Sequence, residues 1–173
     1  DGEVVPILGN AFMNDLAIGN HDALVSGWAR YTHYPLADQH HSLARMAQYT
    51  AVYQKDDHAG DEVRVKERYV EFLKAALQAK ARHDATVAKA KREEVESEAR
   101  TLTVSEIARR FNYPKIDSPA ENPLLILAGL PLPVYITTSY HDFLKVALES
   151  VGKEPQIEVF RWRDGLESIP SLF

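Results

Sequence analysis

The sequence predicts an α/β fold, a Rossmann-like three-layer sandwich with a mostly parallel sheet and a large helical insertion between the first two strands. Two runs of apolar and β-branched residues, Val4–Leu8 and Pro133–Thr138, have the length and composition of buried strands. The long stretch between them repeats apolar residues at steps of three and four, which is the spacing of helices. Because neighbouring parallel strands are joined by long crossovers, this order of elements favours a parallel sheet covered by helices.

The first half of the chain begins with the strand at Val4–Leu8, which ends at Gly9, a residue suited to the turn that follows. Residues 11–30 have a helical spacing interrupted at Gly19, which predicts a helix, a turn and a second helix. Asp38 is placed to cap a third helix. The apolar side of that helix is formed by Leu43, Met46, Ala47, Thr50 and Tyr53.

The second half of the chain continues with helices. Residues 65–77 carry an apolar stripe, whereas residues 80–100 are rich in Ala, Lys, Arg and Glu and predict a long helix with little to bury. Thr103 and Glu106 have the spacing of a capping box, so a new helix is expected to start there and to end near Asn112–Pro114. The remaining predictions are a short helix or turn at 124–130, a helix at 140–150 ended by Gly152, and a third strand at 157–162.

Composition limits the class of protein. The 173 residues are 45% hydrophobic and 26% charged, as expected of one soluble globular domain over residues 1–173, with residues 36–113 as its helical insertion. The first residue is Asp1 rather than Met, which favours a fragment of a longer protein. The net charge of -5 disfavours a protein that coats nucleic acid or an anionic membrane. Cysteine is absent and no apolar run is long enough to span a membrane, so a cytoplasmic location is expected.

Two loops that follow the predicted strands carry the residues suited to chemistry, because ligands of open α/β sheets bind beyond the carboxyl ends of the strands. The first loop has a small, flexible backbone whose amides can approach a phosphate, although an ordinary turn also requires one glycine. The second loop is a run of hydroxyl, imidazole and carboxylate side chains, which alternatively only cap the following helix or face solvent. The candidates are Gly9, Asn10, Ala11 and Phe12 in the first loop, and Thr137, Thr138, Ser139, His141 and Asp142 in the second.

The second loop also carries a resemblance to a known family. Residues 130–144, LPLPVYITTSYHDFL, resemble the LP…ITTNYDDLLE segment of the sirtuin-like domains of bacterial defence and signalling proteins. Residues 3–12, EVVPILGNAF, are similar to the vPFLGAGVS strand and loop that begin those domains. Residues 34–49 and 122–133 resemble the helix after the first loop and the approach to the second strand. The resemblance covers most of the chain, and its specific motifs are the two strand ends.

The family implies a domain that binds NAD and breaks its nicotinamide glycosidic bond. The defence branch does so by hydrolysis, and the classical sirtuins couple the cleavage to acyl-lysine deacylation. Cleavage builds positive charge on the ribose, so the site needs polar groups and a general base. Classical sirtuins carry a cysteine-ligated zinc module, which this cysteine-free chain lacks, so NAD hydrolysis is favoured over deacylation and no metal is expected.

The first loop matches the family in part. Gly9 matches the first glycine of the family's GAG loop, while Asn10 and Ala11 replace the two residues that follow it. The resemblance implies that these residues face the phosphates of NAD. Close approach of a phosphate is harder where Ala11 replaces glycine.

The second loop also matches in part. Thr137 and Thr138 match the family, and Ser139 takes the place of its Asn. His141 takes the place of its first Asp, and Asp142 matches the second. The resemblance implies that this loop faces the ribose and the nicotinamide. The family's later catalytic histidine has no counterpart, because His141 is the last histidine of the chain.

These residues lead to two functional hypotheses. The first is an NAD-binding domain that hydrolyses NAD, with Ser139, His141 and Asp142 as its catalytic residues. The alternative is a nucleotide-sensing or protein-interaction module that has lost turnover, so whether the chain is an enzyme stays open. Expected partners are NAD or a related nucleotide, a fused or associated regulatory module, and a second copy in a homo-oligomer.

Two further patterns carry less weight. Residues 103–111 resemble the start of a helix-turn-helix unit, but prolines follow where a recognition helix should stand, so DNA binding is disfavoured. His33, His40 and His41 lie close together in the sequence without the carboxylate spacing of a metal motif. Surface or capping roles are expected for these histidines.

Overall fold

The computed structural model describes residues 4–36, 38, 40–53, 62–114, 122–139 and 141–158. Of these residues 61% are helical, and two short strands form a parallel pair. The elements in chain order are β1 Ile7–Leu8, α1 Asn10–Ala17, α2 His21–Tyr31, α3 Leu43–Tyr53, α4 Glu62–His83, α5 Lys89–Glu98, α6 Val104–Arg110, α7 Pro123–Gly129, β2 Ile136–Thr137 and α8 Phe143–Ser150.

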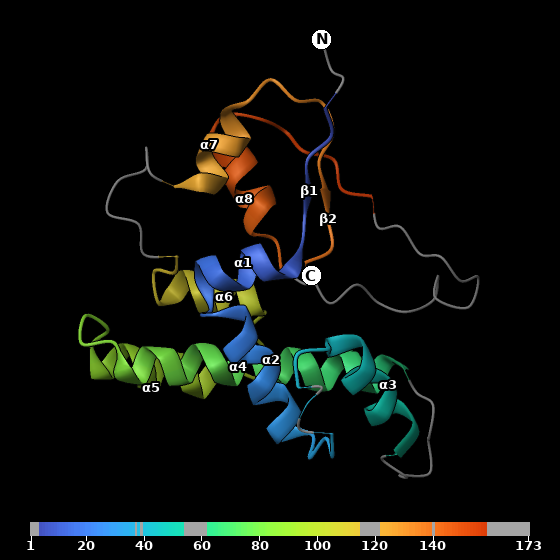
Figure 1. Cartoon of the computed structure of the whole chain (residues 1–173). Helices are drawn as coiled ribbons and strands as arrows, with labels where there is room; N and C mark the ends of the chain where they lie inside the picture. The colour runs from blue at the N-terminus through green and yellow to red at the C-terminus, as the bar shows by residue number, and fades with distance from the viewer. Residues whose placement is uncertain are drawn as a thin grey trace.

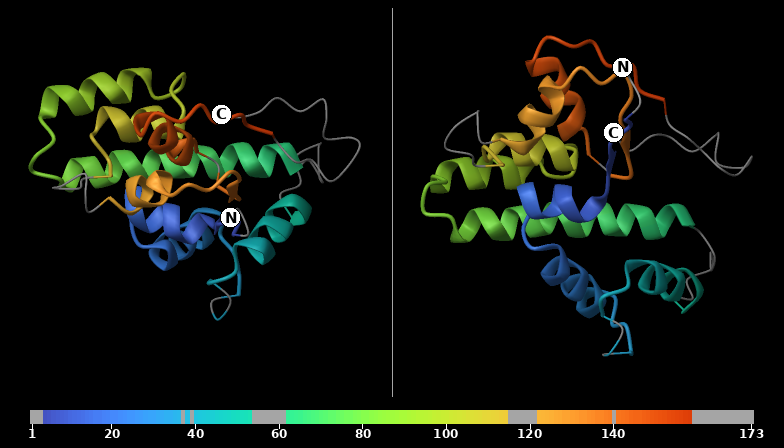
Figure 2. Two further views of the ribbon diagram at one scale, coloured as in Figure 1. Left: turned by 90° about the horizontal axis from the view of Figure 1, so that it is seen from above. Right: turned by 45° about the horizontal axis from the view of Figure 1, so that its top comes forward.

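The long helix α4 is the centre of the helical part, because α2, α3, α5 and α6 all pack against it. Its buried positions Tyr69, Leu73, Leu77 and Ala81 recur every four residues and form one apolar stripe. Figure 1 shows α4 running across the molecule, with the sheet, α7 and α8 on one side of it and α2 and α3 on the other. The right view of Figure 2 shows α1 and α6 between these two parts.

Local sequence signals explain where several helices begin and end. The predicted capping box is confirmed at α6: the Thr103 hydroxyl accepts from the Glu106 amide, and the Glu106 carboxylate accepts from the Thr103 amide. The same helix ends at Arg110, and Asn112, just beyond its cap, has a φ of 59° in the left-handed region. Gly152, with φ of 82°, ends α8 as predicted. The prediction for Asp38 is wrong, since α3 begins at Leu43, after Ser42.

The sheet pairs two strands that are far apart in the sequence, β1 and β2. Ile7 pairs with Ile136 and Leu8 with Thr137, in parallel. The Ile136 amide donates to the Pro6 carbonyl at 3.0 Å. Leu8 is 6% exposed and faces the core, whereas Ile7 is 71% exposed and Ile136 is 46% exposed. One face of the sheet is therefore open.

The predicted fold class, a Rossmann-like three-layer sandwich with a mostly parallel sheet, is wrong. Helices would have to cover both faces of the sheet in such a sandwich, yet Ile7 and Ile136 leave one face exposed. The apolar stripes of the helices are instead buried against each other around α4. Of the predicted third strand, Ile157 and Glu158 are not in a strand, and 159–162 lie outside the described residues.

The charged segment 80–100 is two helices rather than one. The end of α4 and the start of α5 are separated by residues 84–88, where Asp84 accepts hydrogen bonds from the amide and hydroxyl of Thr86. The two helices are joined by Arg82, which donates to Glu96 at 2.7 Å. Val95 is fully buried, so α5 packs through a narrow apolar contact. Among the described residues, no helix has both the length and the apolar character needed to cross a membrane.

Candidate functional site

The carboxyl ends of β1 and β2 lie side by side, because the Thr138 amide donates to the Leu8 carbonyl at 3.1 Å. This hydrogen bond and the parallel register bring the two candidate loops together, although they are far apart in the sequence. Figure 1 shows both strands pointing toward the start of α1, next to α6 and the first turn of α8. The predicted juxtaposition of the two loops is therefore present, with a two-stranded sheet as its base.

The first loop turns directly from β1 into α1. Gly9 is the N-cap of α1, without a side-chain cap, so the amides of the first turn have no partner from the helix itself. Gly9 and Ala11 are exposed, Asn10 is half-buried, and Phe12 is 40% exposed. A Cβ added at Gly9 would meet nothing within 4 Å, so this backbone is open to a ligand. The loop can offer amide donors to an anion.

The second loop contains buried polar side chains, whereas the first loop is mostly exposed. Ser139 is 6% exposed and His141 is 5% exposed, although Thr137 and Thr138 next to them are exposed. The Ser139 amide donates to the Thr137 hydroxyl at 3.1 Å, which turns the chain away from the strand. The expectation that His141 is a solvated surface residue is thus wrong. Tyr140, between these two residues, lies outside the described residues.

Within the described residues, four buried polar atoms of this loop have no hydrogen-bond partner. They are Ser139 Oγ, both ring nitrogens of His141, and Asp142 Oδ1. Buried polar groups are normally hydrogen-bonded, because an unpartnered one loses its hydration without compensation. Ser139 and His141 are therefore not hydrogen-bonded to each other, and no Ser–His relay is formed. Ser139, His141 and Asp142 together hold four such atoms, which makes this loop the candidate site.

The environment of His141 keeps its imidazole neutral. Burial lowers the pKa of His141 to about 4, because removal from water disfavours the charged form. Its own backbone and the Asp142 carboxylate act in the opposite direction and are the weaker effects. The ring packs against Phe143, with the ring centroids 4.3 Å apart. At neutral pH this histidine is an uncharged group able to accept a proton.

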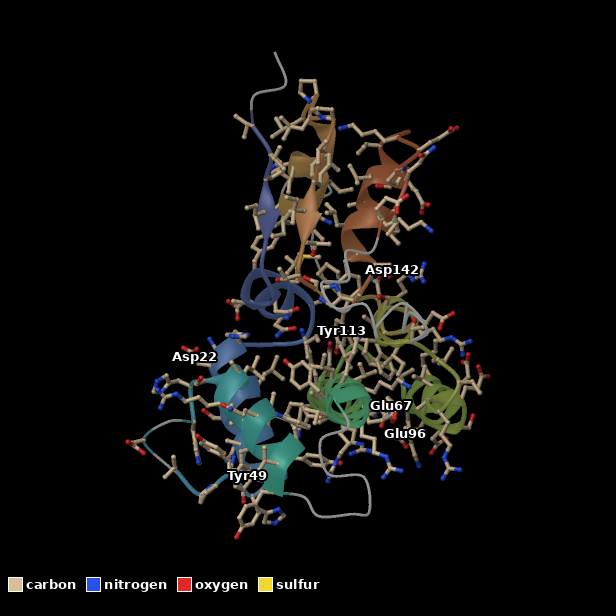
Figure 3. The ribbon with its side chains drawn as sticks, turned by 90° about the vertical axis from the view of Figure 1, so that its right-hand side faces the viewer. Asp22, Tyr49, Glu67, Glu96, Tyr113 and Asp142 are labelled. Atoms are coloured by element: carbon tan, nitrogen blue, oxygen red, sulfur yellow. The ribbon has the colours of Figure 1, made fainter. Side chains whose placement is uncertain are left out.

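Helix α6 holds the loop through Asp142, the N-cap of α8. The Asp142 amide donates to the hydroxyl of Ser105 at 3.0 Å, and Ser105 is 2% exposed. One turn later, Arg109 Nη2 lies 3.6 Å from Asp142 Oδ2. Figure 3 shows Asp142 between the start of α8 and α6. The side chain of Asp142 does not cap α8, so that alternative is wrong for this residue.

The sequence reasoning missed Ser105 and Arg109. The available signal was a buried serine among the apolar residues Val104, Ile107 and Ala108 of α6, which predicts that its hydroxyl has a specific partner. Nothing in the sequence identified Asp142 as that partner, because the contact is tertiary. Within the described residues, no group of three or more His, Cys, Asp or Glu side chains is placed to hold a metal ion.

The site is thus an open amide turn at the start of α1 beside a buried polar loop at the start of α8. The two are held by one strand-to-strand hydrogen bond and by α6. A scan against models of known protein families, a search of curated proteins and a search of solved structures each found no match to this chain.

Proposed function

We propose that the chain binds NAD at the carboxyl ends of β1 and β2 and hydrolyses its nicotinamide glycosidic bond. The observation that carries the proposal is the set of four unpartnered buried polar atoms in Ser139, His141 and Asp142. A ribose with its hydroxyls and a carboxamide supply the donors and acceptors that these atoms lack. The resemblance of residues 3–12 and 130–144 to sirtuin-like domains supports NAD as the ligand.

The proposed reaction uses the neutral imidazole of His141 as the base. A water molecule attacks the anomeric carbon of the ribose, and the carbon–nitrogen bond to nicotinamide breaks. Nicotinamide leaves with the bonding electron pair, which neutralises its ring, and the proton of the water passes to His141. The Asp142 carboxylate stabilises the positive charge that develops on the ribose. The open amides at Gly9–Phe12 would receive the phosphates.

The test is incubation of the full chain with NAD, with released nicotinamide followed by chromatography. We expect His141→Ala to lower the rate about a hundredfold or more, as the loss of a general base does. Ser139→Ala is expected to lower it about tenfold. His83→Ala, at an exposed position near the end of α4, is the control and should retain the wild-type rate.

The serine variant also separates function from folding. Ser139→Ala deletes a buried hydroxyl without a partner, so the free energy of unfolding should stay the same or rise. Ser105→Ala deletes a hydroxyl that accepts the Asp142 amide, so it should cost about 1–3 kcal/mol. A stable Ser139→Ala protein that releases nicotinamide at the wild-type rate would contradict the proposed role.

Two observations favour the second candidate, a nucleotide-binding module without turnover. His141 is 5% exposed, so it reaches a substrate only if the loop rearranges. A pKa of about 4 also makes the imidazole a weak base at neutral pH. In this case calorimetry would detect saturable NAD binding while no nicotinamide is released.

A further inference from the structure

Arg109 has an unused hydrogen-bonding capacity at the edge of the proposed site. Its Nη2 atom lies 3.6 Å from Asp142 Oδ2, beyond the ~2.7–2.9 Å of a charge-assisted hydrogen bond. Within the described part of the chain, the guanidinium donates no hydrogen bond. Its side chain is 48% exposed, whereas Asp142 is 29% exposed. An exposed pair of this geometry is weak, so the guanidinium is able to take another acceptor.

The guanidinium of the neighbouring Arg110, in contrast, is already held by carboxylates. Its Nη1 atom donates to Glu98 Oε2 at 2.6 Å and lies 3.7 Å from Glu94, so its charge is satisfied by α5. The guanidinium of Arg110 is thus held by a close carboxylate, whereas that of Arg109 is more exposed and has only the longer contact with Asp142. The two arginines form a matched pair for mutation, because either change removes one positive charge from the same short helix.

The requirements of Asp142 and Arg109 are complementary. Asp142 Oδ1 is buried without a partner and needs a donor, and the guanidinium of Arg109 needs an anionic acceptor. A ribose that carries a phosphate offers a hydroxyl donor and anionic oxygens a few bonds apart. Arginine presents paired donors that match the geometry of a phosphate.

We infer that Arg109 binds a phosphate of the ligand, so that the site takes phosphorylated ribosides in preference to free nucleosides. This inference rests on the proposed function, because it places the ribose against Asp142. It names a ligand contact on α6, an element outside both strand-end loops.

The experiment is calorimetric titration of the full chain with NAD, nicotinamide mononucleotide and nicotinamide riboside, which lacks the phosphate. We expect the wild-type chain to bind both phosphorylated ligands at least about tenfold more tightly than the riboside. Arg109→Ala should reduce this preference, of which the amides at Gly9–Phe12 keep a part, and leave the affinity for the riboside unchanged. Arg109→Lys, which keeps the charge without the paired donors, should restore part of the preference. Arg110→Ala should bind like the wild type.

The outcomes separate the inference from the function on which it rests. If Arg109→Ala binds each of the three ligands as tightly as Arg110→Ala does, Arg109 makes no phosphate contact, while NAD binding stands. If Arg109→Ala weakens all three ligands equally, the residue only holds the loop, and the inference is overturned. If the wild-type chain binds none of the three, the proposed function fails and the inference fails with it.

Discussion

At the scale of single residues, the molecule gathers unpaired hydrogen-bonding groups in one loop. Within the described residues, Ser139, His141 and Asp142 each bury a polar atom without a partner, whereas the hydroxyl of Thr86 is paired with Asp84. Each such atom costs free energy that ordinary packing does not recover. A protein tolerates that cost where function requires it, which is why these three residues carry the functional proposal.

The clearest prediction at this scale is the dependence of stability on pH through His141. Its pKa is about 4 in the folded chain, below the value near 6.5 of an unfolded histidine. On acidification the unfolded chain therefore takes up the proton first. The free energy of unfolding should fall between about pH 6.5 and pH 4, by up to about 3 kcal/mol from this residue.

The test compares urea denaturation of the wild type and of His141→Phe at several pH values. Phenylalanine fills a similar volume and needs no hydrogen bonds, so the variant should fold and should lose this part of the pH dependence. His83→Phe makes the same change at an exposed position and should keep it. Equal slopes for His141→Phe and the wild type between pH 6.5 and 4 would show that His141 is hydrated.

At the scale of elements, α6 links the helical part to the candidate site. Its capping box fixes its first turn, in which the Ser105 hydroxyl accepts a hydrogen bond from the amide of Asp142.

Thr103→Ala should cost about 1 kcal/mol in the free energy of unfolding, because it removes the acceptor of the Glu106 amide. Thr101→Ala, which removes an exposed hydroxyl bonded to a carbonyl, is the control and should cost less than about 0.5 kcal/mol. Thermal or urea denaturation measures both, and equal losses would mean that the box adds nothing.

Features that depend on neighbouring residues could be predicted from the sequence, and features that depend on tertiary contacts could not. The capping box at Thr103 and the helix end at Gly152 depend on residues within one turn, so spacing alone identifies them. The end of the first strand was predicted at Leu8, where β1 ends, and that of the second at Thr138, one residue after the end of β2, because both strands lie in apolar runs next to turn residues. The number of strands in the sheet could not be predicted, because short apolar runs do not show whether another strand or helix covers them.

The site shows the same limit. The sequence placed Ser139, His141 and Asp142 in one loop, which required only their adjacency. Their burial could not be predicted in the same way, because it depends on tertiary contacts such as that of Asp142 with Ser105. Arg109 was missed for the same reason. Contacts between distant segments decide these features, and no local pattern encodes them.

At the scale of the whole molecule, stability resides in the helices, and the sheet is attached at their edge. Leu8→Ala should cost about 2 kcal/mol or more, because its side chain is 6% exposed and belongs to the core. Ile7→Ala, at the next position of the same strand, should cost less than about 0.5 kcal/mol, because its side chain is 71% exposed. Urea denaturation of the two variants tests which face of the sheet is packed. Comparable losses would mean that another element covers the open face in solution.

The hydrogen bond from Thr138 to Leu8 has a consequence for synthesis on the ribosome. The turn after β1 emerges before α1, but β2, the strand that pairs with β1, emerges only after the helices α1 to α7. Long-range pairing of this kind is slow, because a large loop must close before any contact rewards it. The helices around α4 are able to fold while β1 is still unpaired. The two loops of the candidate site therefore come together only after β2 and the start of α8 have been synthesised.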